Sequence, residues 1–260
     1  MSAADVFHSI SNSISRALDP YSRVARLYPA LLTIAPIAWT VAVLLPGIIT
    51  RDLAEAILSA FVFFGGLTVL VSLARSRGKA LEPRLTSAWG GWRTTVLLRH
   101  SDDTIEKYTK ARYHQKLVAL CEGLVLPSAD VEAQDSKDAD ERYRSATKRL
   151  IEFRRDAKYA MLHKENGLYG FRRNLLGLKT LGIFITGLVM VVTGLIWWHG
   201  ALLPMHTVDD VLKDATTRWP IYVVEALNLV YLVFWIAVVN PAFVRQAADE
   251  YAIALFRTLE

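Results

Sequence analysis

Two long stretches without a charged side chain constrain this chain more than any other feature. Residues 27–50 and 180–208 contain no Asp, Glu, Lys or Arg over 24 and 29 positions. A helix of roughly 20 apolar residues is enough to cross the hydrocarbon core of a bilayer. Of the 260 residues 53% are apolar, and the mean hydropathy of +0.26 is high for a soluble globular domain. The sequence therefore predicts an all-α, polytopic membrane protein.

Four transmembrane helices are predicted from the apolar runs. We place them at residues 27–47, 56–74, 180–200 and 221–244. The chain then divides into an amphipathic N-terminal helix (1–26), a first transmembrane pair (27–74), a cytoplasmic helical region (75–179), a second transmembrane pair (180–244) and a C-terminal helix (245–260). Apolar residues of the N-terminal helix recur every three or four positions, which suits either a membrane surface or packing on cytoplasmic helices.

The distribution of positive charge predicts the orientation. Of the 30 Lys and Arg residues, 22 lie between Arg75 and Lys179, 3 precede the first span and 2 follow the fourth. The other two loops hold only Arg51, Lys213 and Arg218. Because basic loops are retained on the cytoplasmic side, we expect both termini and the middle region to be cytoplasmic.

The middle region is predicted to form a helical hairpin. A helix is expected over residues 103–126, and a second is expected to end at Asn166-Gly167, a pair that suits a helix terminus. Acidic residues gather near the tip, and cations follow on the returning helix. Those cations are either part of solvated helix faces, or a subunit contact, or a site for an anionic ligand. The candidates for ligand binding are Lys148, Arg149, Arg154 and Arg155.

An elbow is predicted after the hairpin, where apolar residues repeat at helical spacing over 167–177 beside two arginines. Aromatic and basic side chains of this kind fix a helix at the membrane interface. The elbow either only anchors the third span or also transmits motion to it. Its candidate gating residues are Tyr169, Phe171, Arg172 and Arg173.

Polar and helix-weakening residues inside the spans are few. The pore or gate candidates are Thr33, Pro36, Thr40, Gly65, Gly66, Glu225 and Asn228. Pro36 is expected to break the backbone hydrogen-bond ladder of the first span. So few mid-membrane charges argue against a proton-coupled or substrate-coupled transporter and favour a gated pore with a largely apolar constriction. The alternative is that these groups serve helix packing alone.

Three cations follow the second span directly, and they predict the ion preference. Arg75, Arg77 and Lys79 would ring the inner mouth of an oligomeric pore. Fixed positive charge raises the local anion concentration within a Debye length of roughly 8 Å. Glu225 opposes this preference, but three cations per subunit outweigh one carboxylate.

No catalytic constellation is recognisable. The six histidines form no HExxH pair, and neither a Gly-rich phosphate loop nor a GxSxG motif is present. Cys121 is the only cysteine and is expected on an apolar helix face. We therefore expect no enzyme, no cofactor and no metal site.

The whole layout, together with residues 165–175, which read ENGLYGFRRNL, resembles the membrane channel effectors of the Hailong type of bacterial anti-phage defence. The resemblance covers the whole chain. It implies a homo-oligomeric, anion-conducting channel among the lipids of the bacterial inner membrane. Its ligand would be a nucleotide or a short single-stranded DNA oligomer made by a partner nucleotidyltransferase. Two alternatives stay open: a non-conducting scaffold that recruits a soluble partner through the basic hairpin, and a membrane enzyme without familiar motifs.

Overall fold

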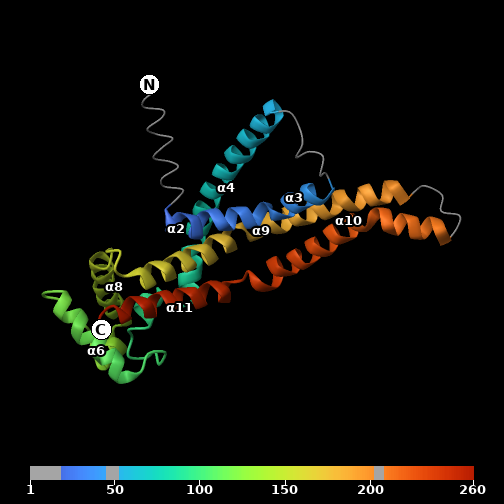
Figure 1. Cartoon of the computed structure of the whole chain (residues 1–260). Coiled ribbons are helices and arrows are strands. Elements are labelled where there is room, and N and C mark those ends of the chain that lie inside the picture. The colour runs from blue at the N-terminus through green and yellow to red at the C-terminus, as the bar shows by residue number, and fades with distance from the viewer. Residues whose placement is uncertain (1–18, 45–52, 202–207) are drawn as a thin grey trace. The chain divides into compact units, whose positions relative to one another are not determined.

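The computed structural model describes residues 19–44, 53–201 and 208–260, and it describes no side chains at 53–64, 199–201 and 208–217. Every regular element in this part of the chain is a helix, so the predicted all-α fold is confirmed. Most of the predicted N-terminal helix, residues 1–18, lies outside the described residues. The helices are α2 (Pro20–Ser22), η1 (Arg23–Leu27), α3 (Tyr28–Leu44), α4 (Leu53–Ala88), α5 (Arg93–Val96), α6 (Lys107–Leu120), α7 (Ala129–Gln134), α8 (Ser136–Phe153), α9 (Ala160–Ala201), α10 (Val208–Val233), η3 (Phe234–Val238) and α11 (Pro241–Arg257), with π-helical geometry in η1 and η3 (Figure 1).

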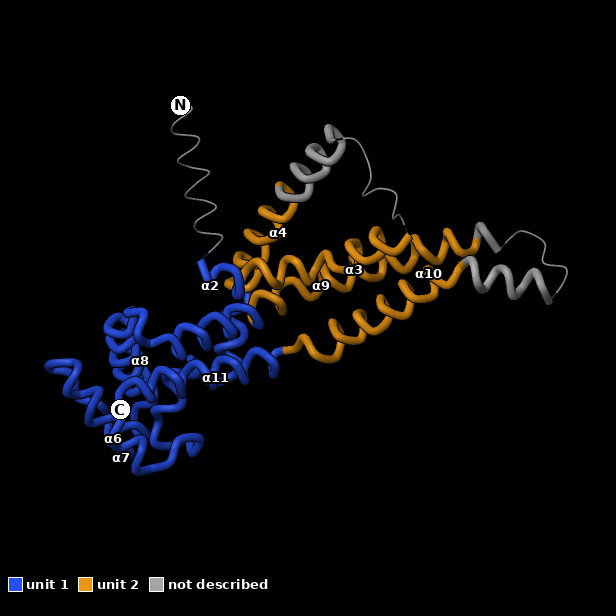
Figure 2. Tube along the Cα trace, viewed as in Figure 1, with its two compact units in different colours: residues 1–25, 80–172, 241–260 blue, residues 26–79, 173–240 orange. Residues whose placement is uncertain are grey.

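The chain forms two compact units (Figure 2). Unit 1 comprises Met1–Ala25, Ala80–Arg172 and Pro241–Glu260, and unit 2 comprises Arg26–Lys79 and Arg173–Asn240. Three helical segments of the described chain are long and apolar enough to cross a membrane: Pro20–Leu44, Ala160–Trp198 and Arg218–Val238. The protein is therefore membrane-embedded.

These three segments correspond to the first, third and fourth predicted spans, with one boundary corrected. The fourth span ends at Val238, because Pro241 has no N–H to continue the helix and begins α11 instead. The predicted second span lies within α4, where side chains are described only from Gly65 onward. That span stays a prediction.

Unit 1 has an apolar core to which α6, α8 and α11 contribute, together with Leu97 and Leu98, which directly follow α5. Tyr143 of α8 and Phe256 of α11 are among its fully buried side chains. Burial of such aromatic residues contributes much of the stability of a helical core. Arg93 of α5 forms an ion pair with Asp249 of α11. The C-terminal helix is thus a core element of unit 1.

The predicted hairpin helices are shorter than expected. α6 ends at Leu120 because Gly123, with φ of +80°, turns the chain well before Pro127. α8 ends at Phe153, and the Asp156 side chain then accepts a hydrogen bond from the Lys158 backbone N–H at 3.0 Å, which stabilises a turn instead of a helix.

The predicted helix end at Asn166-Gly167 is wrong, since α9 passes through both residues without interruption. Gly170 instead allows close packing within unit 1. A Cβ added at Gly170 would lie 2.8 Å from Ala25 Cβ and 3.1 Å from Tyr21 Oη. Gly170 therefore serves a helix contact, and residues 167–177 form a helix in place of an elbow.

In unit 2, α4 and α9 cross with their backbones in contact. A Cβ added at Gly177 would lie 2.7 Å from the backbone nitrogen of Gly78. Small residues at such a crossing allow two membrane helices to approach closely. Next to it, Ala30 of α3 and Leu178 of α9 pack with Leu70 and Ala74 of α4 in a small apolar core.

Candidate functional site

Five polar side chains of unit 2 lie along one face of α10. Arg218, Tyr222, Glu225, Asn228 and Tyr231 follow one another at intervals of three or four residues, a spacing that places them on a single helix face. Each of them takes part in a hydrogen bond to α9 or α3. Because unsatisfied polar groups are costly in hydrocarbon, such a face marks either helix packing or a functional path.

Toward the N-terminal end of α10 the face contacts α9. Arg218 donates from Nη1 to the Trp197 carbonyl at 2.9 Å, and Trp197 Nε1 donates to the Tyr222 hydroxyl at 3.2 Å. One turn further along α10, the Thr193 hydroxyl donates to the Glu225 carboxylate. These contacts satisfy the charged and polar groups of this half of the helix within the chain.

Toward its C-terminal end the same face contacts α3 (Figure 1). Trp39 Nε1 donates to Asn228 Oδ1 at 2.9 Å, and the Tyr231 hydroxyl donates to the Leu32 carbonyl. Leu32 lies four residues before Pro36, so its carbonyl has no backbone N–H to pair with. The helix is continuous through Pro36, and Tyr231 supplies the donor that the proline lacks.

Three buried polar atoms of unit 2 have no hydrogen-bond partner in the described chain. They are Asn228 Nδ2, Thr40 Oγ1 and Trp235 Nε1. Asn228 is fully buried, and its amide group is paired through the oxygen alone. An unpaired buried amide nitrogen costs free energy in the folded chain.

The last turn of α10 is irregular and is stabilised by two side chains. In the π-helical turn η3, the backbone N–H of Val239 reaches back to the Phe234 carbonyl at 3.3 Å. Lys179 of α9 donates from Nζ to the carbonyls of Ile236 and Val239, at 3.0 and 2.8 Å. Asn240 Nδ2 donates to the Ala237 carbonyl at 2.9 Å, which Pro241 leaves without its backbone donor.

The other predicted pore residues do not join this face. The Thr33 hydroxyl donates to the Pro29 carbonyl of its own helix at 2.8 Å. Gly65 and Gly66 of α4 have nothing within 4 Å of an added Cβ. Arg75, Arg77 and Lys79 are exposed side chains of the same helix.

Four residues predicted for the gating elbow lie on α9 in different surroundings. Tyr169 is buried and stacks on Tyr251 with ring centroids 6.4 Å apart, and Phe171 is half-buried. Arg172 donates to the Phe243 carbonyl and to Gln246 Oε1, both at 3.0 Å, which joins α9 to α11 in unit 1.

Arg173, the next residue, is 8% exposed and belongs to unit 2, where it is hydrogen-bonded to Asn174 Oδ1 at 3.4 Å. The two predicted anchoring arginines are thus bonded to protein groups.

The four predicted ligand-binding cations are not equivalent. Arg154 donates to the hydroxyl and the carbonyl of Thr258 at 3.1 and 3.2 Å, so it holds the C-terminal end of the chain. Arg149 lies over the Phe153 ring at 4.4 Å. Lys148, Arg149 and Arg155 are exposed, and they remain the candidates for an anionic ligand.

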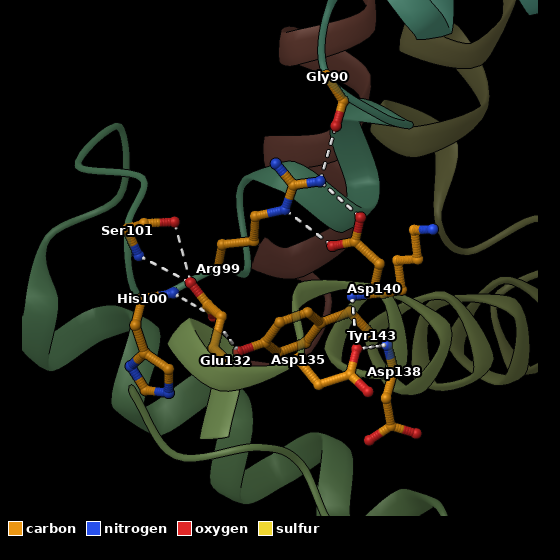
Figure 3. Close-up of polar contacts among 10 residues, drawn as sticks. Gly90, Arg99, His100, Ser101, Glu132, Asp135, Asp138, Asp140 and Tyr143 are labelled. Atoms are coloured by element: carbon orange, nitrogen blue, oxygen red, sulfur yellow. Dashed lines mark hydrogen bonds and ion pairs between the residues drawn. The ribbon is translucent and has the colours of Figure 1, made fainter. Parts of the chain in front are cut away.

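Acidic residues at the tip of the predicted hairpin form hydrogen bonds with other groups of unit 1 (Figure 3). Glu132 is 6% exposed and accepts hydrogen bonds from the backbone N–H groups of His100 and Ser101, from the Ser101 hydroxyl and from the Tyr143 hydroxyl, at 2.8 to 3.1 Å. Burial alone would raise the pKa of Glu132, but these four donors outweigh it and lower the pKa below its ordinary value. Glu132 therefore joins three segments of unit 1 as a carboxylate.

Arg99 is held in a similar way. Its guanidinium donates to both carboxylate oxygens of Asp140, at 2.8 and 2.6 Å, and to the Gly90 carbonyl at 2.7 Å (Figure 3). A hollow of about 460 Å³ adjoins this cluster. Both charged groups that line it, Arg99 and Glu132, are paired, so it offers no free charge to a ligand. No group of three potential metal-ligating side chains occurs among the described residues.

We expect the stability of unit 1 to fall as the pH is lowered below about 6.5, because of His114. Burial lowers the pKa of His114, and the charges of His100 and Lys110 act in the same direction, against the hydrogen bond to the Leu98 carbonyl at 2.8 Å. As the pH falls, His114 therefore binds a proton in the unfolded chain before it does so in the folded chain. Its contribution to the free energy of unfolding is fully present above the pKa of the unfolded state and declines below it. Thermal unfolding of the whole protein in detergent, followed by circular dichroism from pH 7.5 to 5.5, measures the decline.

The matched variant is His114→Gln, which retains a donor for the Leu98 carbonyl but does not titrate. The difference in midpoint between the wild type and this variant should change with pH. If the difference stayed constant between pH 7.5 and 5.5, His114 would not be the group that causes the loss of stability. Glu132 does not interfere, because its lowered pKa confines its own loss of stability to more acidic conditions.

Sequence reasoning found Glu225 and Asn228 but missed Trp39, Lys179 and Tyr231. The signal for Tyr231 was its spacing from Asn228, which continues the helical repeat. Trp39 and Lys179 are ordinary interface residues by sequence, and only their contacts reveal them. No protein-family model, curated protein or solved structure matches this chain.

Proposed function

We propose that the chain forms a homo-oligomeric, ligand-controlled ion channel with four membrane spans, cytoplasmic termini and a preference for anions. The observation that carries this proposal is the polar face of α10, which runs along a helix apolar enough to cross a membrane. Polar residues at membrane depth commonly line ion paths.

The proposed role is that of an anti-phage effector in the bacterial inner membrane. This part rests on the resemblance to the Hailong channel effectors, which also suggests a nucleotide or short single-stranded DNA oligomer as the controlling ligand. The exposed cations Lys148, Arg149 and Arg155 supply partners for phosphate groups. Binding by these residues should weaken as salt is added. The logarithm of the binding constant should fall by about 0.7 per unit of the logarithm of salt concentration for each phosphate contacted on a single strand.

A non-conducting membrane scaffold is the second candidate function. The observation that favours it is that Glu225 and Tyr231 already have partners within the chain. A polar face satisfied in this way also serves helix packing. Conduction by the purified protein separates the two functions.

The test is chloride flux through liposomes that contain the purified protein, with and without short synthetic single-stranded DNA oligomers. We expect Glu225→Gln to raise chloride flux about threefold, since a unit charge about 7 Å from a passing ion in water contributes about 0.6 kcal/mol. The amide oxygen keeps an acceptor for the Thr193 hydroxyl. Thr193→Val is the matched control, because it removes the hydrogen bond and keeps the charge.

Equal chloride flux in wild type and Glu225→Gln, with assembly intact, would remove this carboxylate from the path. Absence of flux with every oligomer tested, in protein that inserts and assembles, would favour the scaffold.

The proposed orientation has its own test. We expect a cysteine introduced at Ser136 to be protected from a membrane-impermeant thiol reagent added to whole cells, and one at Lys213 to react. Cys121→Ser supplies the cysteine-free background. The reverse labelling pattern would overturn the orientation.

A further inference from the structure

An apolar groove of about 500 Å³ lies in unit 2 between α3, α4 and α9. Its walls extend from Ile34 to Val41 on α3 and from Gly66 to Leu73 on α4, with Ile185 of α9 beside them, and every described residue that lines it is apolar. The groove is open at Gly66, where an added Cβ would have nothing within 4 Å. Because α3 and α9 belong to candidate membrane spans, the surroundings of this groove are hydrocarbon.

The lining of the groove limits its possible occupants. An occupant must be apolar over the length of about 10 Å that seven helical residues span. A single hydrocarbon chain is apolar and flexible, and it meets this requirement. A helix of a second copy is the competing occupant, and the experiment below distinguishes the two.

One cation is positioned at the end of the groove. Arg77 follows Leu73 by four residues and Leu70 by seven, which places it on the groove face of α4. Arg75 and Lys79 are each two residues away from it and therefore lie on the opposite face. Arg77 is exposed and forms no ion pair within the described part of the chain.

We propose that this groove binds one acyl chain of an anionic phospholipid, whose phosphate group pairs with Arg77. An acyl chain that enters the groove from the bilayer passes from hydrocarbon to hydrocarbon, so the apolar walls accommodate the chain and the head group supplies the selectivity. A cation near the membrane surface favours an anionic lipid about fivefold. The inference depends on membrane insertion of unit 2 and not on conduction, so it stands or fails separately from the channel.

The experiment uses the full chain in phosphatidylcholine liposomes that contain a phospholipid probe with a photoreactive group midway along one acyl chain. Two probes are compared, one with a phosphatidylglycerol head group and one with phosphatidylcholine. After illumination, mass spectrometry maps the labelled residues. We expect labelling between Ile34 and Val41 and between Gly66 and Leu73, about fivefold stronger with the anionic probe.

Two substitutions test the two ends of the site. Gly66→Leu narrows the groove and should weaken labelling with both probes, whereas Gly187→Leu, at another glycine with open space around it, should not. Arg77→Gln should equalise the two probes, whereas Arg75→Gln on the opposite face should leave the fivefold preference. Ala38→Phe on α3 provides a second groove-narrowing variant if Gly66→Leu does not insert.

Equal labelling of the wild type by both probes would overturn the role of Arg77. Undiminished labelling in both groove-narrowing variants would overturn the site. Cross-links between the groove and a peptide from another copy of the chain, in place of lipid adducts, would assign the groove to the oligomer and also overturn the proposal.

Discussion

Replacing Glu132 by alanine is expected to destabilise unit 1 by about 3–5 kcal/mol, because it removes a buried charged acceptor and leaves its donors unpaired. The Tyr143 hydroxyl and the backbone N–H groups of His100 and Ser101 all lose their partner at once. Amide hydrogen exchange of the whole protein in detergent measures the effect locally. Protection in α6 and α8 should fall strongly, while protection in α9 beyond residue 173 changes little.

Asp130→Ala is the matched control for this prediction. Asp130 is an exposed acid on the same helix, two residues earlier, so its replacement should change stability by less than about 0.5 kcal/mol. Tyr143→Phe removes only one of the donors and should cost about 1.5–3 kcal/mol. If Glu132→Ala and Asp130→Ala had equal exchange rates, Glu132 would not be the residue that joins these segments.

Replacing Gly177 by alanine should force α4 and α9 apart and lower the stability of unit 2 by about 1–3 kcal/mol. A Cβ at this position would lie 2.7 Å from Gly78 N and 2.9 Å from the carbonyl carbon of Arg77. Both are backbone atoms, which cannot move aside as a flexible side chain can. The midpoint of thermal unfolding in detergent should therefore fall, by about 2–4 °C for each kcal/mol in a chain of this size.

Gly187→Ala makes the same change ten residues further along α9. An added Cβ there has nothing within 4 Å, and alanine favours a helix over glycine, so the midpoint should stay level or rise. A similar decrease in both variants would mean that lost backbone flexibility, and not the crossing of α4 and α9, sets the cost at Gly177.

The sequence is most informative where one physical effect acts alone. Long uncharged runs allow few folds besides membrane helices, and the three candidate spans of the described chain coincide with predicted ones. It is least informative about glycine. Asn166-Gly167 has the composition of a helix end, but α9 continues through both residues, and Gly170, three residues later, serves close packing. Sequence alone does not distinguish a glycine that frees the backbone from one that makes room for a neighbour.

The candidate site illustrates the same limit. Glu225 and Asn228 attract attention because polar residues are rare inside spans, whereas the partner of each is a common residue. Pro36 is the clearest case. Its missing N–H predicts an unpaired carbonyl at Leu32, but only the fold shows that Tyr231, almost 200 residues later, donates to it.

The π-helical turn at Phe234–Val238 has a consequence for natural variation. Such a turn holds one residue more than an α-helical turn of similar height. A homologue that lacks a single residue here could close the turn into a regular α-helix and keep the polar face of α10 unchanged before it. Single-residue gaps are therefore expected to be tolerated at this turn, whereas a gap between Tyr222 and Tyr231 would rotate half of the polar face away from its partners.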